Sequence, residues 1–196
     1  DGDSRAMAVL DYDRDGYNDF VMVNANRPTT QLFRNNMGDM LQEADRAIPV
    51  YVQAIGGNKA ARPSKDGAPR DGYGAKFWSA YGSLKALREL RCGEGLGAQN
   101  SNTLSLGIGK NKVAEKLTLI WPNGREQSIE NVAAGAVVTF FENPADSPNG
   151  KGYVLGSRSR VARPPKVSEG GAAKTLAQSP ELARLMAGKS KAPVRL

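Results

Sequence analysis

The stretch Asp-Tyr-Asp-Arg-Asp-Gly-Tyr-Asn-Asp at residues 11–19 places four carboxylates within nine positions of the chain. Three of the aspartates stand at alternate positions, Gly16 permits a sharp turn, and the fourth aspartate closes the loop. Such spacing lets a short segment wrap a hard cation, which takes about six to eight oxygen ligands. We therefore predict a Ca2+ site whose ligands are Asp11, Asp13, Asp15, Asp19 and the backbone carbonyl of Tyr17.

Short apolar segments on both sides of this loop predict strands. Residues 6–10 and 20–23 are apolar and partly β-branched, which is typical of strands. A helix-loop-helix hand would also place a bidentate Glu at the twelfth loop position, which Met22 occupies here. The alternative is a polar hairpin turn without metal, although four uncompensated carboxylates so close together would repel one another.

The loop and its sequel, Gln-Leu-Phe-Arg-Asn-Asn-Met-Gly-Asp at residues 31–39, resemble an FG-GAP or VCBS-type repeat. In that family the calcium-loop hairpin forms blades of integrin-like β-propellers, and the resemblance covers residues 1–45. Met37 and the following Met40 depart from the usual Gly-Asp-Gly-Thr-Phe ending. A solitary blade cannot bury its faces, so we expect this hairpin to pack on the next domain, on further blades or on a partner.

Positive charge is concentrated toward one end of the chain. Residues 1–150 carry 17 Lys and Arg against 18 Asp and Glu, whereas residues 151–196 carry 10 against 2. Residues 144–196 are predicted to form an extended basic tail, with one short helix at residues 179–188. Such a tail suits an acidic protein surface or an anionic surface. A nucleic-acid partner is not expected, because aromatic residues are not interleaved with the basic ones.

The sequence of 196 residues contains no His, which removes the usual general base and most zinc or haem ligation. The single Cys92 cannot form an internal disulfide, and without a His partner we interpret it as a packed core residue rather than a nucleophile. No catalytic residue is therefore predicted. No apolar run is long enough to span a bilayer. The opening Asp-Gly-Asp lies inside what resembles a repeat, which favours a processed protein or an excerpt of a longer one.

Residues 72–143 alternate short β-rich runs with turn signals, which predicts a small antiparallel sandwich or barrel. Residues 83–92 also fit a helical stripe, but the neighbouring strands favour a strand there. Residues 46–71 are rich in Gly, Pro, Lys and Asp and are predicted to be a connector, with a strand at residues 48–55. The predicted fold class is therefore all-β, with the FG-GAP-like hairpin packed on the second module.

A second resemblance rests on the segment Leu-Ile-Trp-Pro-Asn-Gly-Arg-Glu-Gln at residues 119–127 and on Glu-Asn-Val at residues 130–132. Together with the Gly-rich runs at residues 72–76, 93–101 and 104–109, they resemble the ASPIC and UnbV domain. That domain follows FG-GAP repeats in secreted bacterial proteins and in animal cartilage acidic protein, so the order of modules is the same. The resemblance implies an extracytoplasmic bacterial protein, periplasmic or secreted.

These features together predict a non-catalytic, calcium-stabilised interaction or scaffold subunit. It would bind other protein subunits of a larger extracytoplasmic assembly through residues 46–71 and 144–196. One alternative is a carbohydrate-binding or adhesive module that uses Trp121 or Tyr73, although Trp121 also suits a hairpin-locking core position. Another alternative is a fragment of a larger secreted enzyme.

Overall fold

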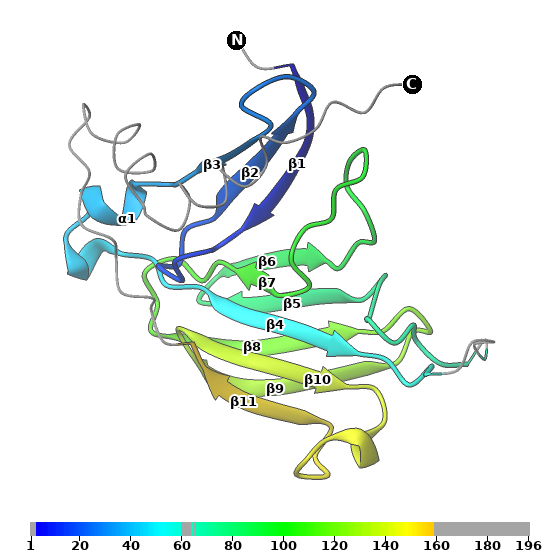
Figure 1. The fold of residues 1–196 in the computed structure, drawn as a ribbon. Helices are drawn as coiled ribbons and strands as arrows, with labels where there is room; N and C mark the ends of the chain where they lie inside the picture. The colour runs from blue at the N-terminus through cyan, green and yellow to red at the C-terminus, as the bar shows by residue number, and fades with distance from the viewer. Residues whose placement is uncertain (1–2, 60–63, 65, 159–196) are drawn as a thin grey trace, which may run out of the picture. The chain divides into compact units, whose positions relative to one another are not determined.

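The computed structural model describes residues 3–59, 64 and 66–158, and these residues form three β-sheets with only short helical turns (Figure 1). The all-β fold class is thereby confirmed. No helix in the described part of the chain is long and apolar enough to cross a membrane.

The first sheet is a three-stranded antiparallel meander, β1-β2-β3, which carries the acidic loop between its first two strands. Its strands are β1 (Ser4–Leu10), β2 (Asp19–Asn24) and β3 (Thr30–Phe33). Opposed apolar side chains hold it together, and the rings of Phe20 and Phe33 stack with centroids 4.7 Å apart. The strand prediction on both sides of the loop is confirmed. Short helical turns follow at α1 (Met37–Met40) and η1 (Glu43–Asp45).

The remaining strands of the described chain form two four-stranded sheets. One has the order β11-β10-β4-β7 and consists of β11 (Tyr153–Ser157), β10 (Ala136–Phe141), β4 (Val50–Ile55) and β7 (Leu104–Leu106). The other has the order β6-β5-β8-β9 and consists of β6 (Leu84–Glu89), β5 (Lys76–Tyr81), β8 (Val113–Ile120) and β9 (Glu126–Ala133). A turn at η2 (Pro144–Asp146) separates β10 from β11.

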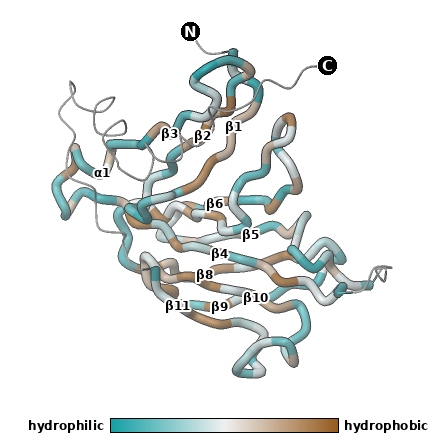
Figure 2. The backbone as a smooth tube through the Cα atoms, viewed as in Figure 1, coloured by the Kyte–Doolittle hydropathy of each residue, from teal (hydrophilic) through white to brown (hydrophobic). Residues whose placement is uncertain are grey.

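One hydrophobic core joins the two four-stranded sheets. Phe77 of β5 and Phe140 of β10 are fully buried, and their ring centroids lie 6.2 Å apart. The apolar stretches of these strands are visible as brown segments in Figure 2. Alternation of side chains along each strand places one set of residues in this core and the other set in solvent, as in a sandwich.

Within residues 83–92 the chain forms a strand rather than a helix. This strand, β6, covers Leu84–Glu89 and pairs in antiparallel register with β5. The expectation of a purely antiparallel sandwich is wrong at one ladder, since β10 pairs with β4 in parallel, with Val137 opposite Tyr51. A parallel pair needs a long crossover, and here the whole segment between β4 and β10 supplies it. Sequence periodicity does not report such long-range pairing.

A second difference concerns the range assigned to the extended tail. Residues Tyr153–Ser157 form β11, which pairs antiparallel with β10. Its apolar run is only three residues long, Tyr153 to Leu155, and lies between Gly152 and Gly156, which explains why the sequence pattern missed the strand. Cys92 is exposed rather than buried in the core, because it follows the end of β6. The predicted helix at residues 179–188 lies outside the described residues.

Candidate metal centre

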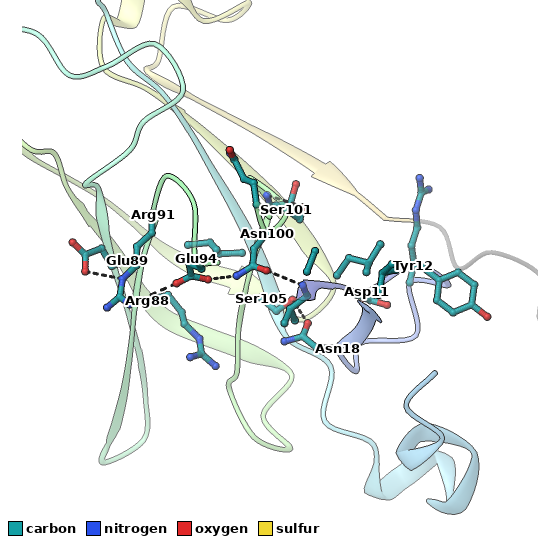
Figure 3. Close-up of a pocket in the computed structure, with 18 of the residues that line it drawn as sticks. Asp11, Tyr12, Asn18, Arg88, Glu89, Arg91, Glu94, Asn100, Ser101 and Ser105 are labelled. Atoms are coloured by element: carbon teal, nitrogen blue, oxygen red, sulfur yellow. Dashed lines mark hydrogen bonds and ion pairs between the residues drawn. The ribbon is translucent and has the colours of Figure 1, made fainter. Parts of the chain in front are cut away.

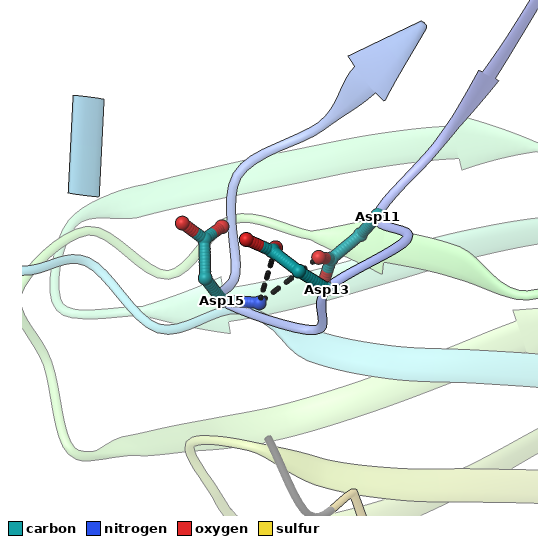
Figure 4. A group of neighbouring side chains, drawn as sticks. All are labelled: Asp11, Asp13 and Asp15. Atoms are coloured by element: carbon teal, nitrogen blue, oxygen red, sulfur yellow. Dashed lines mark hydrogen bonds between the residues drawn. The ribbon is translucent and has the colours of Figure 1, made fainter. Parts of the chain in front are cut away.

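Three aspartate side chains of the loop converge on one point (Figure 4). Asp11, Asp13 and Asp15 each offer a carboxylate oxygen, and these oxygens all lie within 4.8 Å of one another. The three residues are buried, with only 7 %, 1 % and 4 % of their surfaces exposed. Burial without compensation would be costly for three carboxylates, so the arrangement requires positive charge close by.

Backbone N–H groups of the loop donate to these carboxylates and fix their orientation. The Asp15 N–H donates to Oδ1 of Asp11 at 3.0 Å and to Oδ1 of Asp13 at 3.3 Å. The Gly16 N–H donates to Oδ2 of Asp11 at 3.3 Å. Gly16 has φ of 98°, a conformation that a residue with Cβ rarely adopts, so a glycine is needed at this turn. The loop thus wraps around the oxygen cluster.

Asp19, the fourth predicted aspartate ligand, lies outside the cluster that Asp11, Asp13 and Asp15 form. Its Oδ2 accepts from the Tyr12 N–H at 3.0 Å and its Oδ1 accepts from the Asn35 N–H at 2.8 Å. Burial raises the pKa of Asp19, and these two hydrogen bonds oppose that rise. Asp19 therefore ties the loop to the segment after β3 and is not part of the three-carboxylate cluster.

Tyr17, the fifth predicted ligand, also lies beside the cluster. Its N–H donates to Oδ1 of Asp15 at 2.9 Å, and its hydroxyl accepts from the Ala47 N–H at 3.2 Å. These contacts join the loop to the segment that leads into β4.

Arg34, which follows β3, supplies positive charge to the cluster. Its Nε donates to Oδ2 of Asp13 at 2.8 Å, and its guanidinium lies 3.5 Å from Oδ2 of Asp15. A third contact, 2.6 Å long, joins it to Asp39. Burial alone would lower the pKa of Arg34, but the hydrogen bond to Asp13 and the neighbouring carboxylates raise it instead. Arg34 therefore stays charged beside the aspartates.

Two residues from distant parts of the chain meet Asp11. The hydroxyl of Tyr51, on β4, donates to Oδ2 of Asp11 at 2.7 Å. Arg158, next to the end of β11, lies 3.4 Å from the same oxygen, and its guanidinium carbon is 4.6 Å from the centroid of the Tyr51 ring. Burial and the hydrogen bond to Asp11 raise the pKa of Tyr51, so the phenol remains a proton donor.

The charges and atom types of this site fit a hard divalent cation. Four buried aspartates, including Asp19, face two arginines, Arg34 and Arg158, so negative charge remains in excess. All the side-chain atoms that the cluster offers a metal are carboxylate oxygens, which Ca2+ and Mg2+ prefer over softer donors. The alternative of a metal-free turn has partial support, because the two arginines provide some compensation.

Arg34, Tyr51 and Arg158 were not identified from the sequence as site residues. Tyr51 and Arg158 lie 40 and 147 positions from Asp11 in the chain, and the packing of β4 and β11 brings them to it. For Arg34 the sequence offered a weak indication, because this residue lies in the segment that resembles the end of an FG-GAP repeat.

A second network of polar side chains lies at the other end of β4. Glu142 is 4 % exposed and accepts from the N–H groups of Gly57 and Ala68 at 2.7 and 2.8 Å, and from the Asn123 side chain at 2.6 Å. Arg125 forms an ion pair with the same carboxylate. Burial alone would raise the pKa of Glu142, but these donors and the charge of Arg125 lower it. Glu142 thus ties the connector to the Trp-Pro-Asn-Gly turn.

The two aromatic residues considered for sugar stacking differ in their surroundings. Trp121 is only 2 % exposed and donates from Nε1 to Oε1 of Gln127 at 3.1 Å, so it belongs to the core. Tyr73 is partly buried against that core, and its hydroxyl is hydrogen-bonded to the side chain of Gln99. Stacking of a ligand on Trp121 is therefore ruled out in this fold.

The described chain thus combines a β-sandwich with a three-stranded sheet whose loop can hold a cation. Residues 65–147 match the model of the ASPIC and UnbV family, and they form an ASPIC/UnbV domain. This match covers β5 to β10, and it includes Glu142 with its partners Ala68, Asn123 and Arg125 but not Gly57. No curated protein matches the chain.

Proposed function

We propose that this chain is a non-catalytic, calcium-stabilised interaction subunit of a bacterial extracytoplasmic assembly. The observation that carries the calcium part is the convergence of three buried carboxylates, Asp11, Asp13 and Asp15, in one loop. Ca2+ is favoured over Mg2+ because a loop that offers side-chain and backbone oxygens suits its larger, less regular coordination. Tyr17 would contribute its backbone carbonyl, and Asp19 would fix the loop.

The repeat that surrounds the loop is proposed to be of the FG-GAP type. Support comes from the strand-loop-strand arrangement of β1 and β2 and from the apolar character of both faces of their sheet. Directly opposed residues of neighbouring strands share a face, so Met7 and Phe33 lie on one side, and Val23 and Leu32 on the other. These four residues are 50 %, 38 %, 44 % and 50 % exposed. A sheet that is apolar on both faces suits contact with other β-structure.

The partner surface is proposed to include the connector and the start of residues 144–196. β4 lies between β10 and β7 and is largely buried, so we propose that the range 46–71 meets a partner through residues outside Val50–Ile55. Lys59 forms an ion pair of 2.8 Å with Asp146, which brings the two proposed regions side by side. One partner could therefore contact both.

The absence of His from the sequence supports a non-catalytic role, because Cys92 then has no His base to activate it. Extracytoplasmic location is proposed because a calcium site suits compartments where free Ca2+ is high. The ASPIC/UnbV domain agrees with that location through the resemblance given above.

A photo-crosslinking residue at Asp66, which is exposed in the connector, tests the partner surface. The matched control is the same residue at Lys110, which is also exposed but lies in the loop before β8. We expect a discrete crosslinked protein in the periplasmic or secreted fraction of the producing cell with the Asp66 probe alone. Equal crosslinking from both positions, or none from either, would argue against the proposed surface.

A further inference from the structure

A groove of about 920 Å³ lies beside the proposed metal loop, residues 11–19 (Figure 3). Its walls come from β1 and the start of the loop, from β6 and the segment after it, and from the turn that leads into β7. All three of these strands are edge strands of their sheets. The volume is in the range of sites that take a ligand of a few hundred daltons.

Polar side chains with flat hydrogen-bonding groups line this groove. Figure 3 shows a row that runs from Glu89 and Arg91 past Glu94 and Asn100 to the start of the metal loop. Arg91 lies 3.3 Å from Glu89 and 3.6 Å from Glu94, and Glu94 also accepts from the Asn100 amide. The side-chain Oδ1 of Asn100 in turn accepts from the Val9 N–H at 2.7 Å. The row is therefore anchored to β1.

Two arginines of the groove have no carboxylate partner among the described residues. Arg14 and Arg88 are exposed and line the groove, and neither forms an ion pair with any residue that the structure describes. Arg91 and Arg158, by contrast, are paired with Glu and Asp residues. Arg14 also has φ of 58°, a conformation uncommon outside glycine and often found at functional positions. The two unpaired guanidiniums favour an anionic ligand.

The remaining groups indicate what kind of anion fits. Asn18, Gln99 and Ser105 add donors and acceptors that can each serve a hydroxyl group, and Asn18 lies 3.5 Å from the Ser105 hydroxyl. Tyr12 is the one aromatic residue among the lining residues in the described chain, so base stacking has little support. A peptide adding to β1 would find the Val9 backbone already engaged by Asn100 and Ser101.

We infer that this groove binds an acidic oligosaccharide, with Arg88 and Arg14 pairing with its carboxylate groups and the amide and hydroxyl side chains binding its sugar hydroxyls. This function lies beyond the proposed scaffold role and does not depend on a protein partner. It also places sugar recognition at a different site from Trp121, which is buried.

Calorimetric titration of the full chain in calcium-containing buffer with a trimer of galacturonic acid tests this inference. We expect measurable binding that weakens with added salt, and binding at least about tenfold weaker for the neutral analogue maltotriose. Arg88→Gln should lower the affinity for the acidic trimer about tenfold, which one charged hydrogen-bonding contact can supply. Arg14→Gln should lower it in the same direction.

The control is Arg5→Gln, because Arg5 is exposed, pairs only with Asp3 among the described residues and does not line the groove. It should leave the affinity unchanged, and thermal melting should show that Arg88→Gln and Arg5→Gln fold equally well. The inference is overturned if the acidic trimer releases no heat of binding, if maltotriose binds as well, or if Arg88→Gln and Arg5→Gln bind alike. If the wild-type protein binds the acidic trimer but binds no Ca2+, the result counts against the proposed metal site and not against this inference.

Discussion

The hydroxyl of Tyr51 donates a hydrogen bond of 2.7 Å to Oδ2 of Asp11, which joins the centre of the sandwich to the acidic loop at residues 11–19. Tyr51 lies on β4, whose neighbours are β10 and β7, so its position is set by the most buried part of that sheet. A donor that orients a metal-binding carboxylate acts on metal affinity without touching the ion.

Tyr51→Phe should therefore weaken Ca2+ binding about tenfold while the protein still folds. The phenyl ring keeps the packing with Arg158, and only the hydroxyl is lost. Calorimetric titration with Ca2+ measures the change. Tyr153→Phe is the matched control, since no hydrogen bond of its hydroxyl is found among the described residues. Equal affinities for the two variants would show that the Asp11 contact has no influence on the ion.

Arg34→Gln should destabilise the calcium-free protein more than the calcium-bound protein. Without the guanidinium, Asp13 and Asp15 face each other with less positive charge, and a bound cation restores what was lost. We expect a loss of about 2 kcal/mol in the free energy of unfolding in EDTA and a smaller loss in calcium. Urea unfolding in the two buffers provides the comparison, and identical losses would contradict the charge argument.

Glu142→Gln should cost about 3 kcal/mol of stability at neutral pH, because an amide cannot accept from all four donors around it. The folded pKa of Glu142 is lowered, so its ionised form stabilises the fold above the unfolded pKa. That stabilisation is lost as the pH falls through the lower folded pKa. The wild-type protein should therefore lose stability at acid pH more steeply than the variant does, and urea unfolding between neutral and acid pH reveals the difference. Parallel pH profiles would be inconsistent with this role.

Trp121→Ala should destabilise the domain by about 3–5 kcal/mol, which is typical of removing a buried aromatic side chain. Trp78→Ala serves as the control, because Trp78 is 37 % exposed on the outer face of β5 and its loss should cost much less. Chemical unfolding compares the two variants. A larger loss for Trp78→Ala would contradict the position of Trp121 in the hydrophobic core.

The sequence allowed the acidic loop, its two flanking strands and the β-rich second module to be predicted, because each depends on local spacing and alternation. The strand at β11 was missed, since its short apolar run lies between two glycines and depends on pairing with β10. The parallel pairing of β10 with β4 was missed because it joins segments far apart in the chain, and local periodicity does not report such pairing. At the site, three carboxylates were found from spacing, whereas Tyr51 and Arg158 required the folded chain to bring them to Asp11.

Thermal melting in calcium and in EDTA tests the calcium site most directly. A ligand at about a hundredfold excess over its dissociation constant adds about 2.7 kcal/mol to the folded state, which raises the Tm of a chain of this size by about 5–10 °C. We predict a rise of this size for the wild type, its loss in Asp13→Asn, and one bound Ca2+ by elemental analysis of the wild type. Equal Tm values in calcium and EDTA, with no calcium in the purified protein, would contradict the proposed site.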